Sequence, residues 1–228
     1  MGKSAGKKKL RKPQEQSRPG VESKLDPAPV FDYPEIKGSG KLNNKVAVIT
    51  GGDSGIGRAV AILFAKEGAD VAVLYLNEHG DAKETKQIVE KTYGRKCLLI
   101  DGDISSEKFC VSAIKKVRKK FGKINILVNN AAMHYEDETI EDVTAKELEK
   151  TFAINMFSMF YLTKAALKAM PSGSAIINTS SVTAYRGSPN LLNYASTKGA
   201  IISFTRSLAS SLLEKNIRVN AVAPGPIW

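Results

Sequence analysis

Short apolar runs alternate with amphipathic stretches along the chain from Lys45 onward. The apolar runs are typical of strands buried on both faces and predict strands over 46–49, 71–76, 96–100, 124–128, 175–178 and 218–222. Apolar residues at helical spacing predict helices over 58–67, 82–91, 107–121, 145–170 and 192–213. This alternation predicts an α/β fold in three layers, with a parallel sheet between helices, because right-handed crossovers leave little choice.

The first 40 residues have a different pattern and predict a basic, proline-rich N-terminal arm. They are poor in apolar residues and hold five of the nine prolines, namely Pro13, Pro19, Pro27, Pro29 and Pro34. With Gly38-Ser39-Gly40 at its end, this stretch reads as an extended arm or linker without a core of its own. Its few apolar residues are candidates to dock on something, for example another subunit: Val30, Phe31, Tyr33 and Ile36.

The net charge of the 228-residue chain is +11, and much of the excess lies near the N-terminus. Residues 1–45 hold eleven basic and five acidic side chains. A basic tail can contact nucleic acid, an anionic surface or an acidic neighbouring subunit. No aromatic side chains are interleaved with the lysines to stack on bases. We therefore favour a solvated tail over contact with nucleic acid.

Several classes of protein are disfavoured by composition. No stretch approaches the roughly 18 uncharged apolar residues of a membrane span, and no apolar run follows the basic N-terminus as in a secretory signal. Cys97 and Cys110 are too few for a disulfide framework and too isolated for a metal cluster. His79 and His134 lack a second histidine at ligand spacing, so we expect no metal site and assign neither a catalytic role. A reducing cytoplasm is the expected compartment.

The segment from Thr50 to Gly57 is a glycine-rich turn between the first predicted strand and helix. Glycines at such a turn let the backbone approach a pyrophosphate, and the following helix N-terminus offers N–H groups and partial positive charge to it. Here the glycines stand at 51, 55 and 57, not in the commoner Gly-x-Gly-x-x-Gly spacing. The alternative is a strand–helix turn with no ligand, but its position directly after the first strand favours a nucleotide.

Two further motifs lie near predicted strand ends. Asn129-Asn130-Ala131-Ala132 follows strand four, at the edge that faces the ligand crevice in an open parallel sheet. Tyr194 and Lys198 are four residues apart on one helix, so the phenol and ammonium can meet, and a nearby cation lowers a tyrosine pKa. Ser181 follows strand five and could hydrogen-bond a carbonyl or alkoxide oxygen. Taken alone, the pair could be a chance match and the serine a simple cap.

Together these motifs resemble the short-chain dehydrogenase/reductase family, over about Lys45 to the end of the chain. The resemblance rests on Thr50-Gly51, Gly55, Gly57, Asn129-Asn130-Ala131, Asn155, Ser181, Tyr194, Lys198 and Pro224-Gly225. The interval of thirteen residues between Ser181 and Tyr194 is the one that the family shows. Gly52-Asp53-Ser54 and the N-terminal Pro19-Gly20-Val21-Glu22 are typical of its general-stress and glucose/ribitol dehydrogenase-like members.

The resemblance implies a Rossmann-type doubly wound sheet, with a dinucleotide-binding catalytic domain over 41–228. It implies that Tyr194 exchanges a proton with the substrate hydroxyl, Ser181 positions the substrate oxygen, and Lys198 holds the nicotinamide ribose. Asn155 would hold a water that passes protons onward from the lysine. Cofactor contacts would come from these residues: Gly51, Asp53, Ser54, Gly55, Ile56, Gly57, Asp103, Ile104, Asn129, Ala131, Tyr194, Lys198, Pro224, Gly225 and Ile227.

The choice between NAD and NADP depends on the residues near the adenine-side ribose. The ribose-sensing position at the end of the second strand falls at about Tyr75-Leu76, where neither an acid nor an arginine stands. Asn77 or Glu78 could reach the ribose, and Arg58 is the nearest cation. We favour NAD because no basic side chain is placed for a 2′-phosphate.

The family pattern also bears on the ends of the chain. Family members continue past the proline–glycine segment with a substrate-covering loop, a further helix and a seventh strand. We therefore expect the catalytic domain to be C-terminally incomplete at Trp228. The resemblance further implies a homotetramer, with the arm reaching a neighbouring subunit.

The expected function is hydride transfer between NAD(P) and an alcohol, sugar or polyol, or carbonyl substrate, with Tyr194 as general acid/base. Such an enzyme would be an NAD(P)-dependent short-chain dehydrogenase/reductase acting on CH–OH donors. The alternative is a catalytically idle nucleotide-binding protein that uses its basic arm to contact nucleic acid or another partner.

Overall fold

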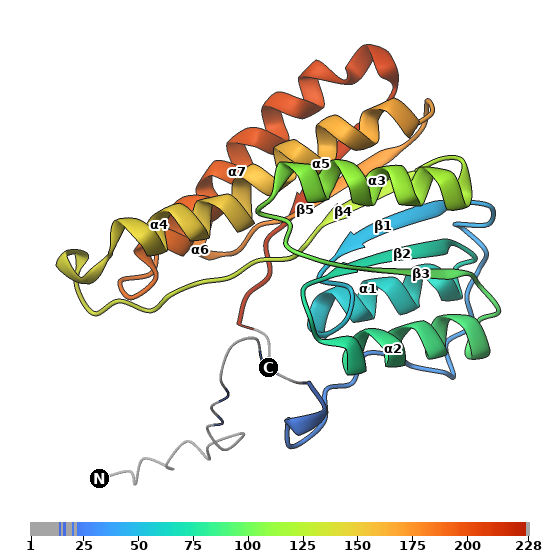
Figure 1. Ribbon diagram of the computed structural model, residues 1–228, viewed down its shortest axis with the longest axis horizontal. Helices are drawn as coiled ribbons and strands as arrows, with labels where there is room; N and C mark the ends of the chain where they lie inside the picture. The colour runs from blue at the N-terminus through green and yellow to red at the C-terminus, as the bar shows by residue number, and fades with distance from the viewer. Residues whose placement is uncertain (1–13, 15, 17–19, 21, 227–228) are drawn as a thin grey trace, which may run out of the picture.

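A six-stranded parallel sheet forms the centre of the molecule (Figure 1), in a computed structural model that describes residues 14, 16, 20 and 22–226. The strand order is β3-β2-β1-β4-β5-β6, and every neighbouring pair is parallel. The strands are β1 (Val46–Thr50), β2 (Asp70–Tyr75), β3 (Cys97–Asp101), β4 (Ile126–Asn129), β5 (Ala175–Thr179) and β6 (Arg218–Val222). The order reverses between β1 and β4, which creates a switch point where a ligand crevice is expected beyond the carboxyl ends of the strands.

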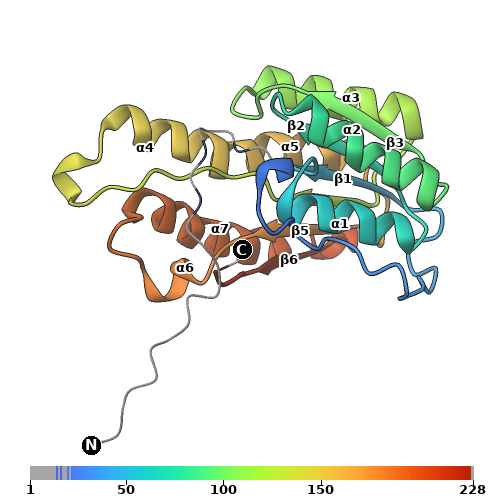
Figure 2. The same ribbon diagram turned by 90° about the horizontal axis from the view of Figure 1, so that it is seen from below.

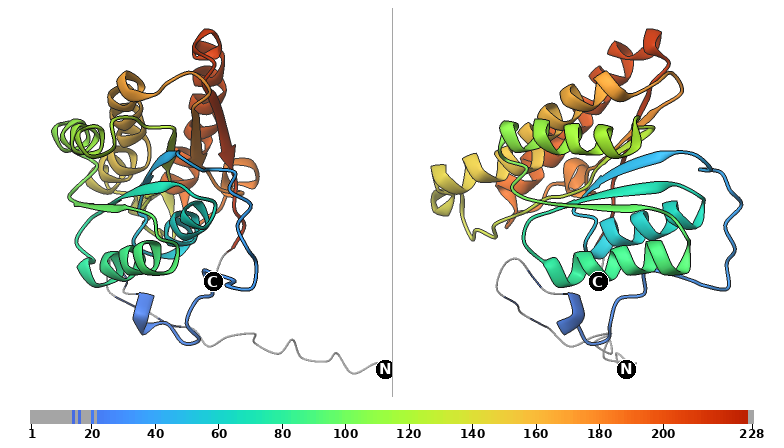
Figure 3. Two further views of the ribbon diagram at one scale, coloured as in Figure 1. Left: turned by 90° about the vertical axis from the view of Figure 1, so that its right-hand side faces the viewer. Right: turned by 45° about the vertical axis from the view of Figure 1, so that its right-hand side comes forward.

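Helices cover both faces of the sheet, which confirms the three-layer Rossmann-type fold (Figure 3). Alternate residues of β1 point to opposite faces, so Val46 and Val48 pack in one core cluster while Ala47 and Ile49 pack in the other. The first cluster contains residues of α3 (Glu107–Phe121) and α5 (Ser158–Ala166), with α7 (Leu192–Ser211) beside them. The second contains residues of α1 (Gly55–Lys66) and α2 (His79–Gln87).

The predicted helix over 145–170 is interrupted. It consists of α4 (Ala145–Phe152), a π-helical turn η4 (Ala153–Phe157), α5, and a 3-10 turn η5 (Leu167–Ala169). The π turn carries Asn155, whose fully buried side chain is held by groups outside the helix. Single π turns inside helices are frequent at functional sites.

Other boundaries differ from the prediction by a few residues. The helix expected over 82–91 starts earlier, as α2, and ends in a second π turn, η2 (Ile88–Thr92). Strand β4 starts at Ile126 instead of Ile124, because the Ile124 N–H bonds the carbonyl of Ala169 at a helix end and not a neighbouring strand. Four short helices were not predicted, because each has too few residues to show a period: η1 (Glu22–Lys24), η3 (Ile140–Asp142), α6 (Thr183–Arg186) and η6 (Leu213–Lys215). Within the described ranges, no helix combines the length and apolarity needed to cross a bilayer.

The described part of the N-terminal arm lies against α1 (Figure 2). It begins with a 3-10 turn, η1 (Glu22–Lys24), and its contacts run from the first turn of α1 to its last. At the far end, Asp32 pairs with Lys66, and the Ser39 and Lys41 N–H groups donate to Glu67. The arm is therefore attached to its own domain. The basic cluster within residues 1–13 lies outside the described residues.

Candidate active site

The glycine turn has a backbone that accepts no other residue at two positions. Gly51 has φ +62°, and a Cβ there would lie 3.2 Å from the Cα of Ala131. A Cβ on Gly57 would lie 1.8 Å from the Gly51 carbonyl oxygen. A Cβ on Gly55 at the start of α1 would meet nothing within 4 Å, but its φ of +53° favours glycine, and its N–H donates to the Glu22 carboxylate of the arm. The N–H groups of the first helical turn that lack intrahelical acceptors are suited to a pyrophosphate.

Thr50 and Asn130 hold the turn in place. The Thr50 hydroxyl accepts the N–H groups of Asn130 at 2.9 Å and Ala131 at 3.0 Å. The Asn130 amide donates to the Thr50 carbonyl at 3.1 Å, and its oxygen accepts from Thr179 at 3.3 Å. One asparagine therefore joins the carboxyl ends of β1, β4 and β5. The family resemblance implies that Asn129 or Asn130 lies near the adenine-side ribose, and the Asn-Asn motif also suggested that such side chains tie neighbouring loops together, as Asn130 does here.

The side chain of Asn129 does not face the crevice in the way expected of a cofactor contact. Its amide donates to Asn178 Oδ1 at 2.9 Å, and the residue is almost fully buried. Asn178 in turn donates to Thr205 in α7 at 2.9 Å. This chain links β4, β5 and α7, so a ligand would meet Asn129 through its backbone.

Ser181, Tyr194 and Lys198 come together at the carboxyl end of β5. The Lys198 Nζ lies 5.2 Å from the centre of the Tyr194 ring and donates to the Thr179 carbonyl at 2.8 Å. The Ser181 hydroxyl oxygen accepts the Thr183 N–H at 3.1 Å, which orients the serine from the start of α6. The i, i+4 spacing on α7 therefore brings the phenol and the ammonium together, as expected.

Burial sets the titration of this pair. It raises the Tyr194 pKa above its usual value, while a hydrogen bond with the Ser181 side chain acts in the lowering direction. Burial lowers the pKa of Lys198 to about 8. The expectation of a lowered tyrosine pKa was therefore wrong for this structure, since it counted the lysine charge and ignored desolvation of the phenol.

Asn155 joins three segments of the site from the π turn. Its amide nitrogen donates to the Met133 carbonyl at 2.8 Å and to Thr197 Oγ1 at 3.1 Å, and its oxygen accepts the Met133 N–H at 2.8 Å. Thr197 directly precedes Lys198 in α7. Asn155 therefore holds the segment after β4 against the helix that carries Tyr194 and Lys198.

The remaining predicted contacts lie around the same sheet edge. Asp103 is exposed after β3 and accepts the Ser105 N–H at 2.8 Å, while Ile104 is buried in the core. The Pro224 carbonyl accepts the Val182 N–H at 3.0 Å, which joins the proline–glycine segment to the residue after Ser181. Gly225 is exposed, and the predicted contact at Ile227 lies outside the described residues.

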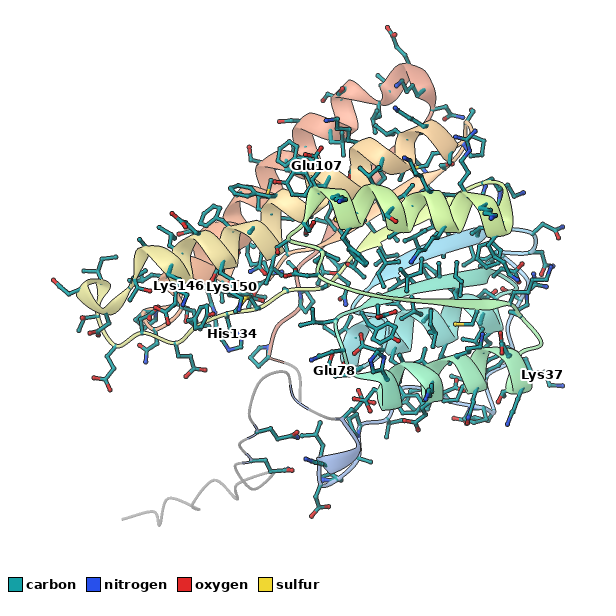
Figure 4. The ribbon with its side chains drawn as sticks, in the orientation of Figure 1. Lys37, Glu78, Glu107, His134, Lys146 and Lys150 are labelled. Atoms are coloured by element: carbon teal, nitrogen blue, oxygen red, sulfur yellow. The ribbon has the colours of Figure 1, made fainter. Side chains whose placement is uncertain are left out.

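Two residues gain importance from the structure. The ring of His134 lies edge-on to Tyr194 with centroids 5.7 Å apart (Figure 4 labels His134 on the segment after β4), although the sequence offered no reason to pair them. Arg58 is 2% exposed and forms ion pairs with Glu22, Asp81 and Glu84. A cation following Gly57 is visible in the sequence, but its partners are far away along the chain.

Fold and site define a dinucleotide-binding α/β oxidoreductase, and comparison with known proteins gives the family. The family model described as short chain dehydrogenase matches residues 45–228. The chain therefore belongs to the short-chain dehydrogenase/reductase family.

Its relatives include bacterial and plant proteins. General stress protein 39 of Bacillus subtilis is 55% identical over 94% of this chain and 75% of that protein. The NADPH-dependent aldehyde reductase 1, chloroplastic, of Arabidopsis thaliana is 48% identical over 95% of this chain and 77% of that protein. The glucose and ribitol dehydrogenase of Daucus carota is 46% identical over 95% and 76%. These names give no support to an idle nucleotide-binding protein.

Solved structures include complexes with both nicotinamide dinucleotides. A short-chain dehydrogenase from Burkholderia cenocepacia in complex with NADP matches with a TM-score of 0.78 and 33% identity, over 81% of this chain and 75% of that one. An NAD+-bound xylitol dehydrogenase matches with a TM-score of 0.76 and 32% identity, over 81% and 71%. The similarity does not choose between the two cofactors.

Proposed function

We propose that this chain transfers a hydride between a nicotinamide dinucleotide and an alcohol, a sugar or polyol, or a carbonyl compound, with Tyr194 as general acid/base. The observation that carries the proposal is the meeting of Tyr194, Lys198 and Ser181 at the sheet edge that also holds the glycine turn. The dinucleotide, when bound, supplies or accepts the hydride. The chain's own residues have to bind the substrate, orient it and move one proton.

Each of the three residues has a distinct task. Ser181 donates a hydrogen bond to the substrate oxygen and holds it beside the phenol. Tyr194 keeps its proton at neutral pH, because burial raises its pKa, so it is suited to protonate a carbonyl oxygen as the carbonyl is reduced. In oxidation the phenolate has to take the proton, and the Lys198 charge 5.2 Å from the ring favours that state. A proton path from Lys198 past Asn155 stays a prediction.

We propose NAD over NADP as the preferred dinucleotide. Arg58 is the cation at the glycine turn, and its guanidinium is held by three carboxylates. A 2′-phosphate needs a free cation at the ribose, as provided by an arginine in NADP-specific sites. The individual cofactor contacts named above, in the glycine turn and at the ends of the later strands, are part of this proposal.

We further propose a homotetramer in the cytoplasm, with a small-molecule substrate and no nucleic-acid or membrane partner. An apolar groove between α5 and α7 supports self-association, since Phe160 in it is 51% exposed and packs against Phe204. Two buried free cysteines, Cys97 and Cys110, suit a reducing compartment. Light scattering at several concentrations tests the oligomeric state, and fractionation of cells that express the chain tests the compartment.

A turnover screen tests the proposed reaction. The chain is incubated with NAD or NADP and a panel of polyols and sugars, and with NADH or NADPH and a panel of aldehydes and ketones, while the nicotinamide absorbance is followed. We expect turnover with at least one pair, and loss of it in Ser181→Ala by about 100-fold, as for removal of an oxyanion donor. Dinucleotide binding without any turnover, across the whole panel, would refute the enzymatic proposal.

A further inference from the structure

The N-terminal arm enters the cofactor-binding turn at Glu22. The side chain of Glu22 is 6% exposed and forms an ion pair with Arg58 at 2.6 Å. Its carboxylate also accepts the N–H of Gly55, the first residue of α1. The Glu22 N–H donates to the Asp81 carboxylate at 3.2 Å. Glu22 therefore contacts the glycine turn directly, although it lies 33 positions before Gly55 in the chain.

Arg58 is the residue through which Glu22 acts on the rest of the turn. Its Nε donates to the Asp53 carbonyl at 2.8 Å, and Nη2 donates to the Asp81 carbonyl at 3.1 Å. Its Nη1 lies 3.0 Å from Glu84 and 2.6 Å from Glu22. The guanidinium is therefore occupied on every side by the arm, the glycine turn and α2. It is not free to approach a ligand.

The charges around this turn are predominantly negative. Asp53 lies near Glu78 and Asp81, whose charges add to burial in raising its pKa to about 6. Figure 4 labels Glu78 next to the start of α2, on the side of the sheet where the arm arrives. Glu22 and Glu84 bring the number of carboxylates to five, and Arg58 pairs with three of them, Glu22, Asp81 and Glu84. The ribose of a dinucleotide lies between such a turn and the end of the second strand, so a 2′-phosphate would meet this field.

We propose that Glu22 is a positioning residue that makes the site select NAD(H) against NADP(H). It holds Arg58 away from the ribose and adds one negative charge at the first turn of α1. The inference rests on the proposed function to the extent that the turn binds a nicotinamide dinucleotide. It assigns to the arm a part in cofactor choice, in addition to any contact with a neighbouring subunit.

A second anchor of the arm provides a matched control. Asp32 pairs with Lys66 and bonds the Tyr93 hydroxyl, at the opposite end of α1 from Glu22. Replacing it loosens the arm without changing the charge at the glycine turn. A general effect of arm attachment would appear in both variants, whereas a local effect of charge would appear only at Glu22.

The experiment is equilibrium binding of NADH and NADPH to the chain, followed by nicotinamide fluorescence at fixed ionic strength. The wild type, Glu22→Gln, Glu22→Asp, Glu84→Gln and Asp32→Asn are compared by the ratio of the two dissociation constants. We expect wild type to prefer NADH, and Glu22→Gln to shift the ratio toward NADPH by about tenfold, from removal of one charge facing a doubly charged phosphate. Glu22→Asp and Asp32→Asn should stay within about twofold of wild type. Glu84→Gln should shift the ratio in the same direction by roughly threefold, because its side chain is half exposed.

The outcomes separate this inference from the proposed function. Failure of the wild type to bind either dinucleotide refutes the proposed function, and the inference falls with it. Binding with a ratio that Glu22→Gln leaves unchanged, or that Asp32→Asn shifts equally, overturns the inference alone, as does a wild type that prefers NADPH. If Glu22→Gln does not fold, the Glu84→Gln variant decides, and an unchanged ratio there overturns the inference.

Discussion

The glycine-turn side and the tyrosine side of the site lie at one edge of the sheet, yet they treat a buried cation in opposite ways. At the turn, Arg58 is 2% exposed and meets three carboxylates. At the other side, Lys198 is 1% exposed and donates to a backbone carbonyl, and no carboxylate of the described chain pairs with it. The first cation holds backbone segments together. The second keeps an uncompensated charge beside the phenol.

This difference offers a physical criterion for separating a structural charge from the catalytic one that we propose at Lys198. A buried cation with partners is in its most stable setting, and removing it leaves buried carboxylates without a counter-charge. A buried cation without a carboxylate destabilises the fold, which is why burial lowers the pKa of Lys198. Such a cost is typical of a residue retained for its chemistry. The same replacement at the two positions should therefore change stability in opposite directions.

The largest expected loss of stability comes from Arg58→Met. The variant leaves the carboxylates of Glu22 and Asp81 buried and unpaired, so we expect the free energy of unfolding to fall by about 3–5 kcal/mol. Chemical denaturation at pH 7 measures it. A loss below about 1 kcal/mol would mean that the ion pairs around Arg58 contribute little.

The matched replacement Lys198→Met should stabilise the fold and abolish most of the activity. At pH 7 the lysine is protonated in both folded and unfolded chains, and its shifted pKa corresponds to a cost of about 3 kcal/mol, which the variant removes. The gain should shrink as the pH rises from about 8 past the ordinary lysine value, because the unfolded chain then binds the extra proton. Turnover should fall at least about 100-fold. A melting temperature of Lys198→Met below that of wild type at pH 7 would contradict the contrast drawn between Lys198 and Arg58.

Asp53→Asn should give a stabilisation that depends on pH. The carboxyl pKa is raised from 3.8 to about 6 in the folded chain, mainly by burial. Wild type therefore loses stability as the pH rises between these values, and the neutral variant does not. We expect no difference near pH 3.5 and a gain of about 3 kcal/mol at pH 7.5. Melting curves of both proteins across this range measure it, and a gain that does not change with pH would refute the proposed cause.

The smallest effect is expected for Asp32→Asn. Burial raises the Asp32 pKa, but hydrogen bonds from Lys66 and Tyr93 outweigh it and hold the pKa below its usual value. The contribution to stability is present above the ordinary pKa and is lost as the pH falls through the lowered one. For a pair near the surface we expect a loss within about 1 kcal/mol at pH 7, which becomes smaller as the pH falls below the ordinary Asp value. A loss of 3 kcal/mol or more would place the arm in the core of the fold.

Much of the fold could be predicted because its signals are local. Apolar runs such as Val46–Thr50 produce buried parallel strands, and the spacing of Tyr194 and Lys198 on a helix brings their side chains together. The π turn at Asn155 could not be predicted, because the groups that hold it lie 22 and 42 residues away. The contact between Glu22 and Arg58 could not be predicted either, because the two residues are far apart along the chain. The direction of the Tyr194 pKa shift depends on burial, which a spacing argument does not include.

The rate of hydride transfer in Tyr194→Phe tests the central claim most directly, because the variant removes one hydroxyl and keeps the ring beside Lys198. Wild type and variant are compared at saturating dinucleotide and substrate, with dinucleotide affinity measured on the same samples. We expect the rate to fall by about 1,000-fold while the dissociation constant of the dinucleotide stays within about threefold. A rate within tenfold of wild type would contradict the assignment of Tyr194 as the acid/base.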